Sequence, residues 1–159
     1  MTQYSVYAIG AALVDTEIQV NDSELGAMAV EKGVMTLVDE DRQAELMGHL
    51  QGHLVGASHA SGGSAGNSMI ATALFGAPTF MSCKVADDAD GDIYLADLEA
   101  SGVAHSLTDK RGSGTTGKCL VLITPDAERS MNTFLGVSET LSTAAVDDQA
   151  IASSDWAYL

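Results

Sequence analysis

Short β-rich runs alternate with helical patterns along most of this chain, and this alternation limits the folds open to it. Residues 4–9 form an apolar, β-rich run that ends at Gly10. Residues 68–75 then repeat apolar side chains at helical spacing, and residues 79–85 form another β-rich run. Parallel strands need such a helical crossover between them. The pattern therefore predicts an α/β fold with a mostly parallel sheet flanked by helices.

Two further β-rich regions predict a second, smaller sheet. Residues 16–20 alternate polar and apolar side chains, which is typical of a half-exposed strand. Residues 118–124 and 129–135 flank a Pro125-Asp126 turn and predict a hairpin. We expect these segments to pair with each other, away from the main sheet.

The charge balance excludes several classes of partner. The sequence has 7 Lys and Arg against 22 Asp and Glu, a formal net charge of -15. Nucleic acids and anionic membranes are bound by clustered basic side chains, so we expect neither as a partner. No run approaches about 18 apolar residues, and the N-terminus lacks the basic region of a signal peptide. With two cysteines expected to be reduced thiols, these features predict a cytoplasmic protein.

The length fits one ordinary domain, but the C-terminal residues favour a larger one. The chain has 159 residues, and Trp156 to Leu159 have the pattern of a buried strand that is just beginning. Natural termini usually lie at the surface. We therefore expect the sequence to stop within a domain, in the middle of its sheet.

The Gly-rich segment 112–119 nearly matches the phosphate-binding pattern GxxxxGK[ST]. Cys119 replaces the hydroxyl residue that would contact the metal ion. The β-rich run that follows offers no helix N-terminus to a phosphate. A loop that enters the hairpin is the preferred interpretation.

A second Gly-rich segment, Gly62 to Asn67, supports competing interpretations. Its first five residues match GxSxG, the turn that presents the nucleophile of α/β hydrolases, so Ser64 could be the nucleophile of a serine hydrolase. An aspartate between residues 87 and 90, with His105, would complete the triad. Alternatively, the glycines allow close approach of a ligand, and Asn67, at the start of the next helix, offers its amide to a polyhydroxyl compound. A plain turn with a helix cap explains the same residues.

Two histidines are candidates for a metal site. His49 and His53 lie four residues apart on an expected helix and could share an ion. No third ligand is in sight, and Gly52 weakens that helix. We expect a surface pair and no metal site.

Four segments, taken in order, carry a resemblance to a known family. Together they are similar to the N-terminal half of the ribokinase-like (PfkB-type) carbohydrate and nucleoside kinases. Arg129-Ser130-Met131, in the last of them, most resembles the adenosine-kinase branch. The segments are Gly10 to Asp15, Gly62 to Asn67, Val85 to Gly91, and Thr116-Gly117 with the residues leading to Met131.

The resemblance implies a ribokinase-like sheet with a small β lid, formed by residues near 16–38 and 105–136 within one domain portion spanning 1–159. It implies transfer of the ATP γ-phosphoryl group to a sugar or nucleoside hydroxyl, with Mg²⁺. The family's catalytic aspartate and ATP-binding half would lie outside this chain, so we expect the chain alone to be inactive. A non-catalytic ligand-binding fragment is the alternative. Because the lid often builds dimers in this family, a homodimer through the lid is a further expectation.

The resemblance also implies roles for single residues. Asp15 would accept hydrogen bonds from sugar hydroxyls. Arg129, with Lys118 near it, would supply positive charge toward the transferred phosphoryl group. Ala11 stands where nucleoside-type members often carry Asn, which weakens adenosine as the assigned substrate. The other substrate-binding positions implied are Leu13, Leu37, Gly62, Gly63, Ser64, Asn67, Met131 and Thr133.

Overall fold

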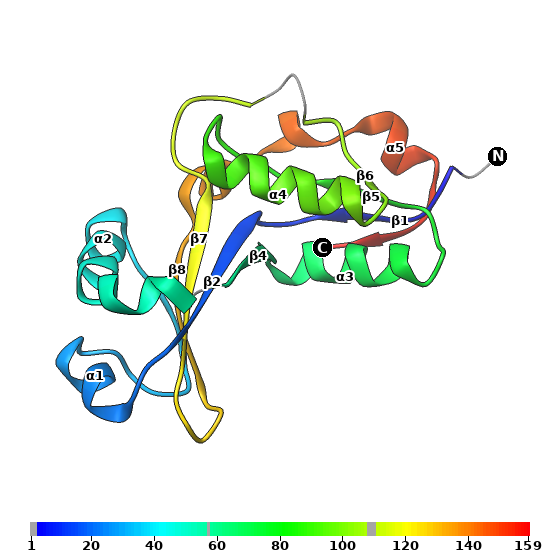
Figure 1. Cartoon of the computed structure of the whole chain (residues 1–159). Coiled ribbons are helices and arrows are strands. Elements are labelled where there is room, and N and C mark those ends of the chain that lie inside the picture. Colours follow the sequence, from blue (N-terminus) through cyan, green and yellow to red (C-terminus); the bar gives the residue numbers. More distant parts are fainter. Residues whose placement is uncertain (1–2, 57, 108–110) are drawn as a thin grey trace.

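A computed structural model describes residues 3–56, 58–107 and 111–159, which form two β-sheets with helices packed on them (Figure 1). The strands are β1 (Tyr4–Ile9), β2 (Leu13–Gln19), β3 (Met35–Leu37), β4 (Ser58–Gly62), β5 (Thr79–Ser82), β6 (Val103–Ala104), β7 (Gly117–Ile123), β8 (Arg129–Phe134) and β9 (Ser154–Tyr158). The α-helices are α1 (Asp22–Ala27), α2 (Glu40–His49), α3 (Ser64–Leu74), α4 (Ala89–Ala100) and α5 (Asp148–Ala152). Short 3₁₀ helices span Gln51–Gly56, Gly136–Thr140 and Thr143–Ala145.

The first sheet has the strand order β6-β5-β1-β9 and is parallel throughout. Successive side chains point to opposite faces. Ala8 and Met81 share a core with α3 and α4, whereas Tyr7 and Phe80 pack with Ala150 of α5. Helices thus cover both faces, and the α/β class with a mostly parallel, helix-flanked sheet is confirmed (Figure 1).

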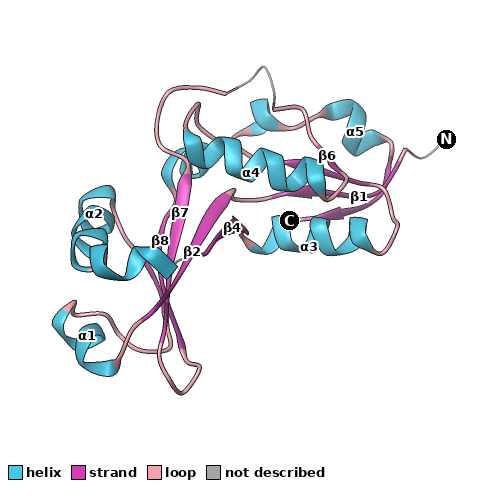
Figure 2. Cartoon of the chain, in the orientation of Figure 1, coloured by secondary structure: helices cyan, strands magenta, loops and turns pink. Residues whose placement is uncertain are grey.

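The second sheet has the strand order β3-β8-β7-β2-β4 and mixed strand directions (Figure 2). Its centre is the expected antiparallel hairpin of β7 and β8, with β2 parallel to β7. Helices α1 and α2 cover one face, where Ile18, Leu46 and Leu122 belong to one buried cluster. The opposite face carries the other set of alternating side chains and borders a cleft.

The second sheet draws on more of the chain than the expected segments 16–38 and 105–136. β4 adds an edge strand antiparallel to β2. Its sequence, SHASG, has no β-branched or aromatic residue, so backbone pairing with β2 and not strand propensity forms it. β2 also begins at Leu13, because its parallel pairing with β7 extends as far as Gly117.

The apolar residues at the C-terminal end form β9, which pairs in parallel with β1. The expectation that this strand is buried is wrong. Trp156 is 74% exposed and Leu159 is 88% exposed. β9 is an edge strand of the first sheet. Its side chains are largely exposed, because no described helix or neighbouring strand packs over them.

The helices are short. The longest in the described ranges, α4, has 12 residues. None of the described helices has the length and apolar character needed to cross a membrane.

Candidate functional site

A cleft of about 630 Å³ lies between the open face of the second sheet, the residues that follow β1 and the first turn of α3. Arg129 and all the substrate-binding residues implied by the family resemblance line it, except Gly62. They are Leu13, Asp15, Leu37, Gly63, Ser64, Asn67, Arg129, Met131 and Thr133. Segments far apart in the sequence therefore meet at one site.

The strand register explains how one sheet face gathers these side chains. Ala60 pairs with Asp15, Asp15 with Cys119, Cys119 with Thr133, and Thr133 with Leu37. These residues form one row that crosses all five strands, and paired residues face the same side of a sheet. Asp15 consequently lies in a mostly apolar floor.

Asp15 is the one acidic side chain that lines the cleft among the described residues. It is half-buried, and no described residue donates a hydrogen bond to its carboxylate. Burial raises the pKa of Asp15 above 3.8, the negative charge of Glu17 raises it further, and Arg129 opposes both. A carboxylate with free lone pairs in such a place can accept hydrogen bonds from ligand hydroxyls.

Close packing requires glycine at both position 62, against Asp15, and position 63, against Ala11. A Cβ atom at Gly62 would overlap the Asp15 carboxylate. Gly63 has a positive φ of 85°, and a Cβ there would lie 2.7 Å from the carbonyl oxygen of Ala11. Gly62 thus shapes the site from beneath, although it does not line the cleft.

Helix α3 begins one turn earlier than expected, which corrects the placement of Asn67 at its start. Gly63 is the N-cap, and the backbone N–H of Asn67 donates a helical hydrogen bond to the Gly63 carbonyl at 3.0 Å. The small residues Ser64 and Ala65 continue the helix directly from the glycine pair. No side chain caps this end, so the first N–H groups of α3 are available to an oxygen ligand at the cleft.

The structure separates Arg129 and Lys118, the two basic residues expected to supply positive charge together. Arg129, at the start of β8, lines the cleft and forms an ion pair with Glu17. Lys118 does not contribute positive charge to the cleft, because it lies on the α2 side of the sheet and pairs with Asp90 at 2.7 Å. Successive residues of β7 face opposite sides, so Lys118 points away from its neighbour Cys119.

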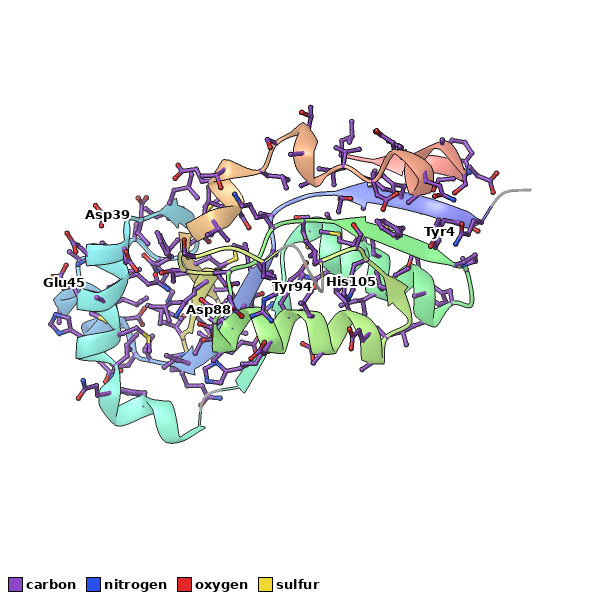
Figure 3. All side chains as sticks on the ribbon, turned by 90° about the horizontal axis from the view of Figure 1, so that it is seen from above. Tyr4, Asp39, Glu45, Asp88, Tyr94 and His105 are labelled. Carbon is purple, nitrogen blue, oxygen red and sulfur yellow. The ribbon has the colours of Figure 1, made fainter. Side chains whose placement is uncertain are left out.

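The hydrolase interpretation lacks its histidine in the described structure. Ser64 is exposed at the first position of α3, but no histidine is among the residues that line the cleft. His105 lies next to α4, with Nε2 3.5 Å from Glu99, and its side chain is 5% exposed (Figure 3). His59 contacts Thr16 at 3.1 Å on the other face of the sheet.

Local structure also bears on residues 112–119 and on the histidine pair. β7 begins at Gly117, so a strand and not a helix follows the near-match to the phosphate loop. His53 lies 3.1 Å from Glu24, and the described residues contain no group of three or more potential metal ligands.

Cys119 is a cleft residue that sequence reasoning missed. It is buried, at 4% exposed, and lies in the cleft floor between Asp15 and Thr133. The Thr133 hydroxyl donates to its sulfur at 3.3 Å, and burial raises the pKa of the Cys119 thiol. No local sequence pattern marks Cys119 as a cleft residue. Its position follows from the pairing of β7 with β2, which sets Cys119 beside Asp15.

Comparisons with known proteins agree with this architecture. A family model described as pfkB family carbohydrate kinase matches residues 34–159. A probable sugar kinase from Rhizobium etli CFN 42 is 35% identical with a TM-score of 0.89, over 99% of this chain and 47% of that one. Adenosine kinase from Sinorhizobium meliloti is 36% identical with a TM-score of 0.88, over 98% and 46% of the two chains. The comparison with curated proteins gave no match.

A more distant structure shares the fold. Adenosine kinase from Schistosoma mansoni, in complex with adenosine, is 20% identical with a TM-score of 0.84, over 99% of this chain and 46% of that one. The chain thus spans about half the length of the structures it matches. Because the family model covers most of the residues, the chain belongs to the pfkB family of carbohydrate kinases.

Proposed function

We propose that this chain is the substrate-binding half of a kinase that phosphorylates a hydroxyl group of a sugar or nucleoside. The observation that carries the proposal is the Asp15 carboxylate, half-buried in the cleft without a hydrogen-bond donor among the described residues. Two adjacent hydroxyls of a ribose-like ring would satisfy its oxygens. The amides at the start of α3 and the side chain of Asn67 would bind further hydroxyls of the same ring.

The cleft walls favour a nucleoside over a simple sugar. Met35, Leu37 and Met131 line the side of the cleft formed by β3 and β8 and provide apolar contact for a flat base. The similar structure from Sinorhizobium meliloti is an adenosine kinase. Ala11, which offers no polar side chain to the ligand, keeps inosine and ribose as rivals to adenosine.

ATP and Mg²⁺ are the phosphoryl donor and metal ion that the family implies. The charged groups lining the described cleft are Asp15 and Arg129, and the Arg129 guanidinium is engaged by Glu17. No described cluster of acidic, His or Cys side chains could hold a metal ion. These residues suit a hydroxylated substrate and do not fit a metal-bound triphosphate, so we assign ATP and Mg²⁺ mainly to residues outside this chain. Arg129 would meet the transferred phosphoryl group after leaving Glu17.

Two further parts of the proposal concern the setting of the protein. The acidic composition and the two buried free cysteines favour the cytoplasm. β3 is the outer strand of the second sheet, so its unpaired edge is open to a lid homodimer. Analytical ultracentrifugation would test the dimer.

Binding and catalysis are tested separately. Saturation-transfer NMR with adenosine, inosine and ribose measures binding, and transfer of radiolabelled phosphate from ATP with Mg²⁺ measures catalysis. We expect saturation transfer to at least one compound and no phosphorylated product from this chain alone. Binding of none of the three would contradict the substrate-binding role. Product formed by the chain would contradict the assignment of the catalytic groups to residues outside it.

A further inference from the structure

A second cavity, of about 340 Å³, lies behind the sheet that forms the cleft floor. It is bordered by α2, by the opposite faces of β2 and β7, and by the start of α4. Thr16 and Lys118 line it, and each directly adjoins a cleft residue, Asp15 or Cys119, in its strand. Because neighbouring residues of a strand face opposite sides, this cavity is separate from the cleft.

Gln43, on α2, is a buried amide without a partner at this cavity. It lines the cavity and is 6% exposed, yet its Oε1 is buried with no hydrogen bond. Its side chain makes no hydrogen bond to any described residue, so rotation of the terminal amide can present either oxygen or nitrogen to the cavity. Buried polar groups are nearly always paired, and an unpaired one calls for a partner.

The other groups at the cavity define the chemistry of that partner. Glu40 accepts a hydrogen bond from Thr115 at 3.0 Å, and Asp90 pairs with Lys118 at 2.7 Å. Two carboxylates against one engaged ammonium favour a ligand with positive charge, and His59 is a further polar group on the wall. The rest of the wall is apolar, formed by Ala44, Met47, Leu120 and Phe134.

We propose that this cavity is a second ligand site, which binds an amine with a compact apolar group. The apolar group would pack against Met47, Leu120 and Phe134. The ammonium would donate to the Gln43 oxygen and to the Glu40 carboxylate. The volume is in the usual range for small-molecule pockets, and the site is independent of whatever the cleft binds.

The test uses three probes of nearly equal shape and different charge: benzylamine, benzyl alcohol and benzoate. Each is titrated into the ¹⁵N-labelled 159-residue chain at neutral pH, and amide shifts are followed. We expect saturable shifts with benzylamine at the Gln43 side-chain amide, along α2 and around residues 118–120. Its half-saturation concentration should be at least about tenfold below that of benzoate, as expected when charged hydrogen bonds are gained.

Three variants identify the binding groups. Gln43→Leu should weaken benzylamine binding about tenfold, since it removes the buried acceptor. Glu40→Gln, an exposed change in the first turn of α2, should weaken benzylamine and leave benzyl alcohol unaffected. Gln51→Leu is the matched control, because Gln51 is exposed and outside the cavity, and it should change nothing.

Several outcomes would overturn the site. Equal affinity for the three probes would exclude charge recognition. No saturable binding, or benzylamine binding unaffected by both Gln43→Leu and Glu40→Gln, would mean that the Gln43 amide pairs within the protein. Asn132 would then be the first candidate for the partner of Gln43. Its side-chain Nδ2 is also buried without a hydrogen bond, on the same face of the sheet. Shifts confined to Asp15, Ser64 and Asn67 would place the probe in the cleft instead.

Discussion

At the scale of single residues, the pKa values of Asp15, on β2, and Asp126, in the turn between β7 and β8, are shifted in opposite directions. Burial and Glu17 raise the pKa of Asp15, whereas hydrogen bonds from Lys32 and Thr124 hold the pKa of exposed Asp126 at about 2. An aspartate with a raised pKa becomes less favourable to folding as pH rises through it, and one with a lowered pKa favours folding above 3.8. Of these two aspartates, Asp15 is the one that receives no hydrogen bond from a described residue, and a ligand can therefore use its carboxylate.

Carbon-detected NMR titration of the carboxyl groups tests this contrast. We expect Asp15 to titrate above 3.8 and Asp126 near 2. Glu17→Gln should lower the pKa of Asp15 by removing a negative neighbour, and Arg129→Met should raise it by removing a positive one. Ligand binding through the carboxylate should weaken as pH falls through the Asp15 pKa. An Asp15 pKa at or below 3.8 would remove the electrostatic basis of the site.

Gly62 offers a second residue-scale prediction. Gly62→Ala places a methyl group where the Asp15 carboxylate lies, so the carboxylate must move. We expect ligand affinity to fall about tenfold or more, in line with a misplaced charged hydrogen bond. Gly48→Ala, on the open surface of α2, is the control and should raise stability by about 0.5–1 kcal/mol. Unchanged affinity in Gly62→Ala would show that the glycine does not position Asp15.

At the scale of elements, Asp88 connects the two sheets. It caps α4 by accepting from the Gly91 amide at 2.8 Å. It also accepts from the amide of Thr116 at 2.8 Å and from its hydroxyl at 2.6 Å, just before β7. Although partial burial alone would raise the pKa of Asp88, these hydrogen bonds lower it. The stability that Asp88 contributes is therefore present above 3.8 and is lost as pH falls through the lowered pKa.

Asp88→Ala should lower the free energy of unfolding by about 1–2 kcal/mol, because it removes a helix cap. The loss should shrink as the pH falls through the lowered pKa of Asp88, because the wild-type carboxylate then takes up a proton. Urea denaturation over a series of pH values from 7 downwards measures both effects. Asp41→Ala, in the exposed first turn of α2, is the control and should cost little. Equal losses for the two variants would contradict the connecting role of Asp88.

Elements also mark what the sequence could predict. The periodicity of β1, α3, β5 and the β7–β8 hairpin was strong enough to give the fold class. The sequence pattern does not predict β4, because its residues SHASG carry little strand propensity and pairing with β2 forms it. The start of α3 was placed a turn too late, since Gly63 caps the helix by backbone conformation alone.

The candidate site was likewise predictable in part from the sequence and in part only from the structure. Asp15, Asn67 and Arg129 came from the family resemblance, and they line one cleft. Cys119 in the floor depends on register across separate strands, which local patterns do not encode. Strand register also decides that Arg129 pairs with Glu17 and that Lys118 faces the α2 side of the sheet.

At the scale of the whole molecule, the net charge of -15 opposes compaction through self-repulsion. Added salt screens that repulsion over distances of about 10 Å at 0.1 M. Relief of about 1 kcal/mol would raise Tm by roughly 2–4 °C for a chain of this size. Thermal unfolding at low and at moderate NaCl should show this rise, with sucrose as an uncharged control for osmotic effects. A Tm that falls with NaCl would mean that the ion pairs outweigh the repulsion.

The central claim is that the chain binds a hydroxylated substrate through Asp15. Isothermal titration calorimetry tests it most directly, using whichever of adenosine, inosine and ribose binds most tightly to the wild-type chain. The account predicts that Asp15→Ala weakens binding roughly 100-fold or more, because two charged hydrogen bonds of about 1.5–3 kcal/mol each are lost. Asp126→Ala, outside the cleft, should bind like the wild type. Equal affinity of Asp15→Ala and the wild-type chain would contradict the account.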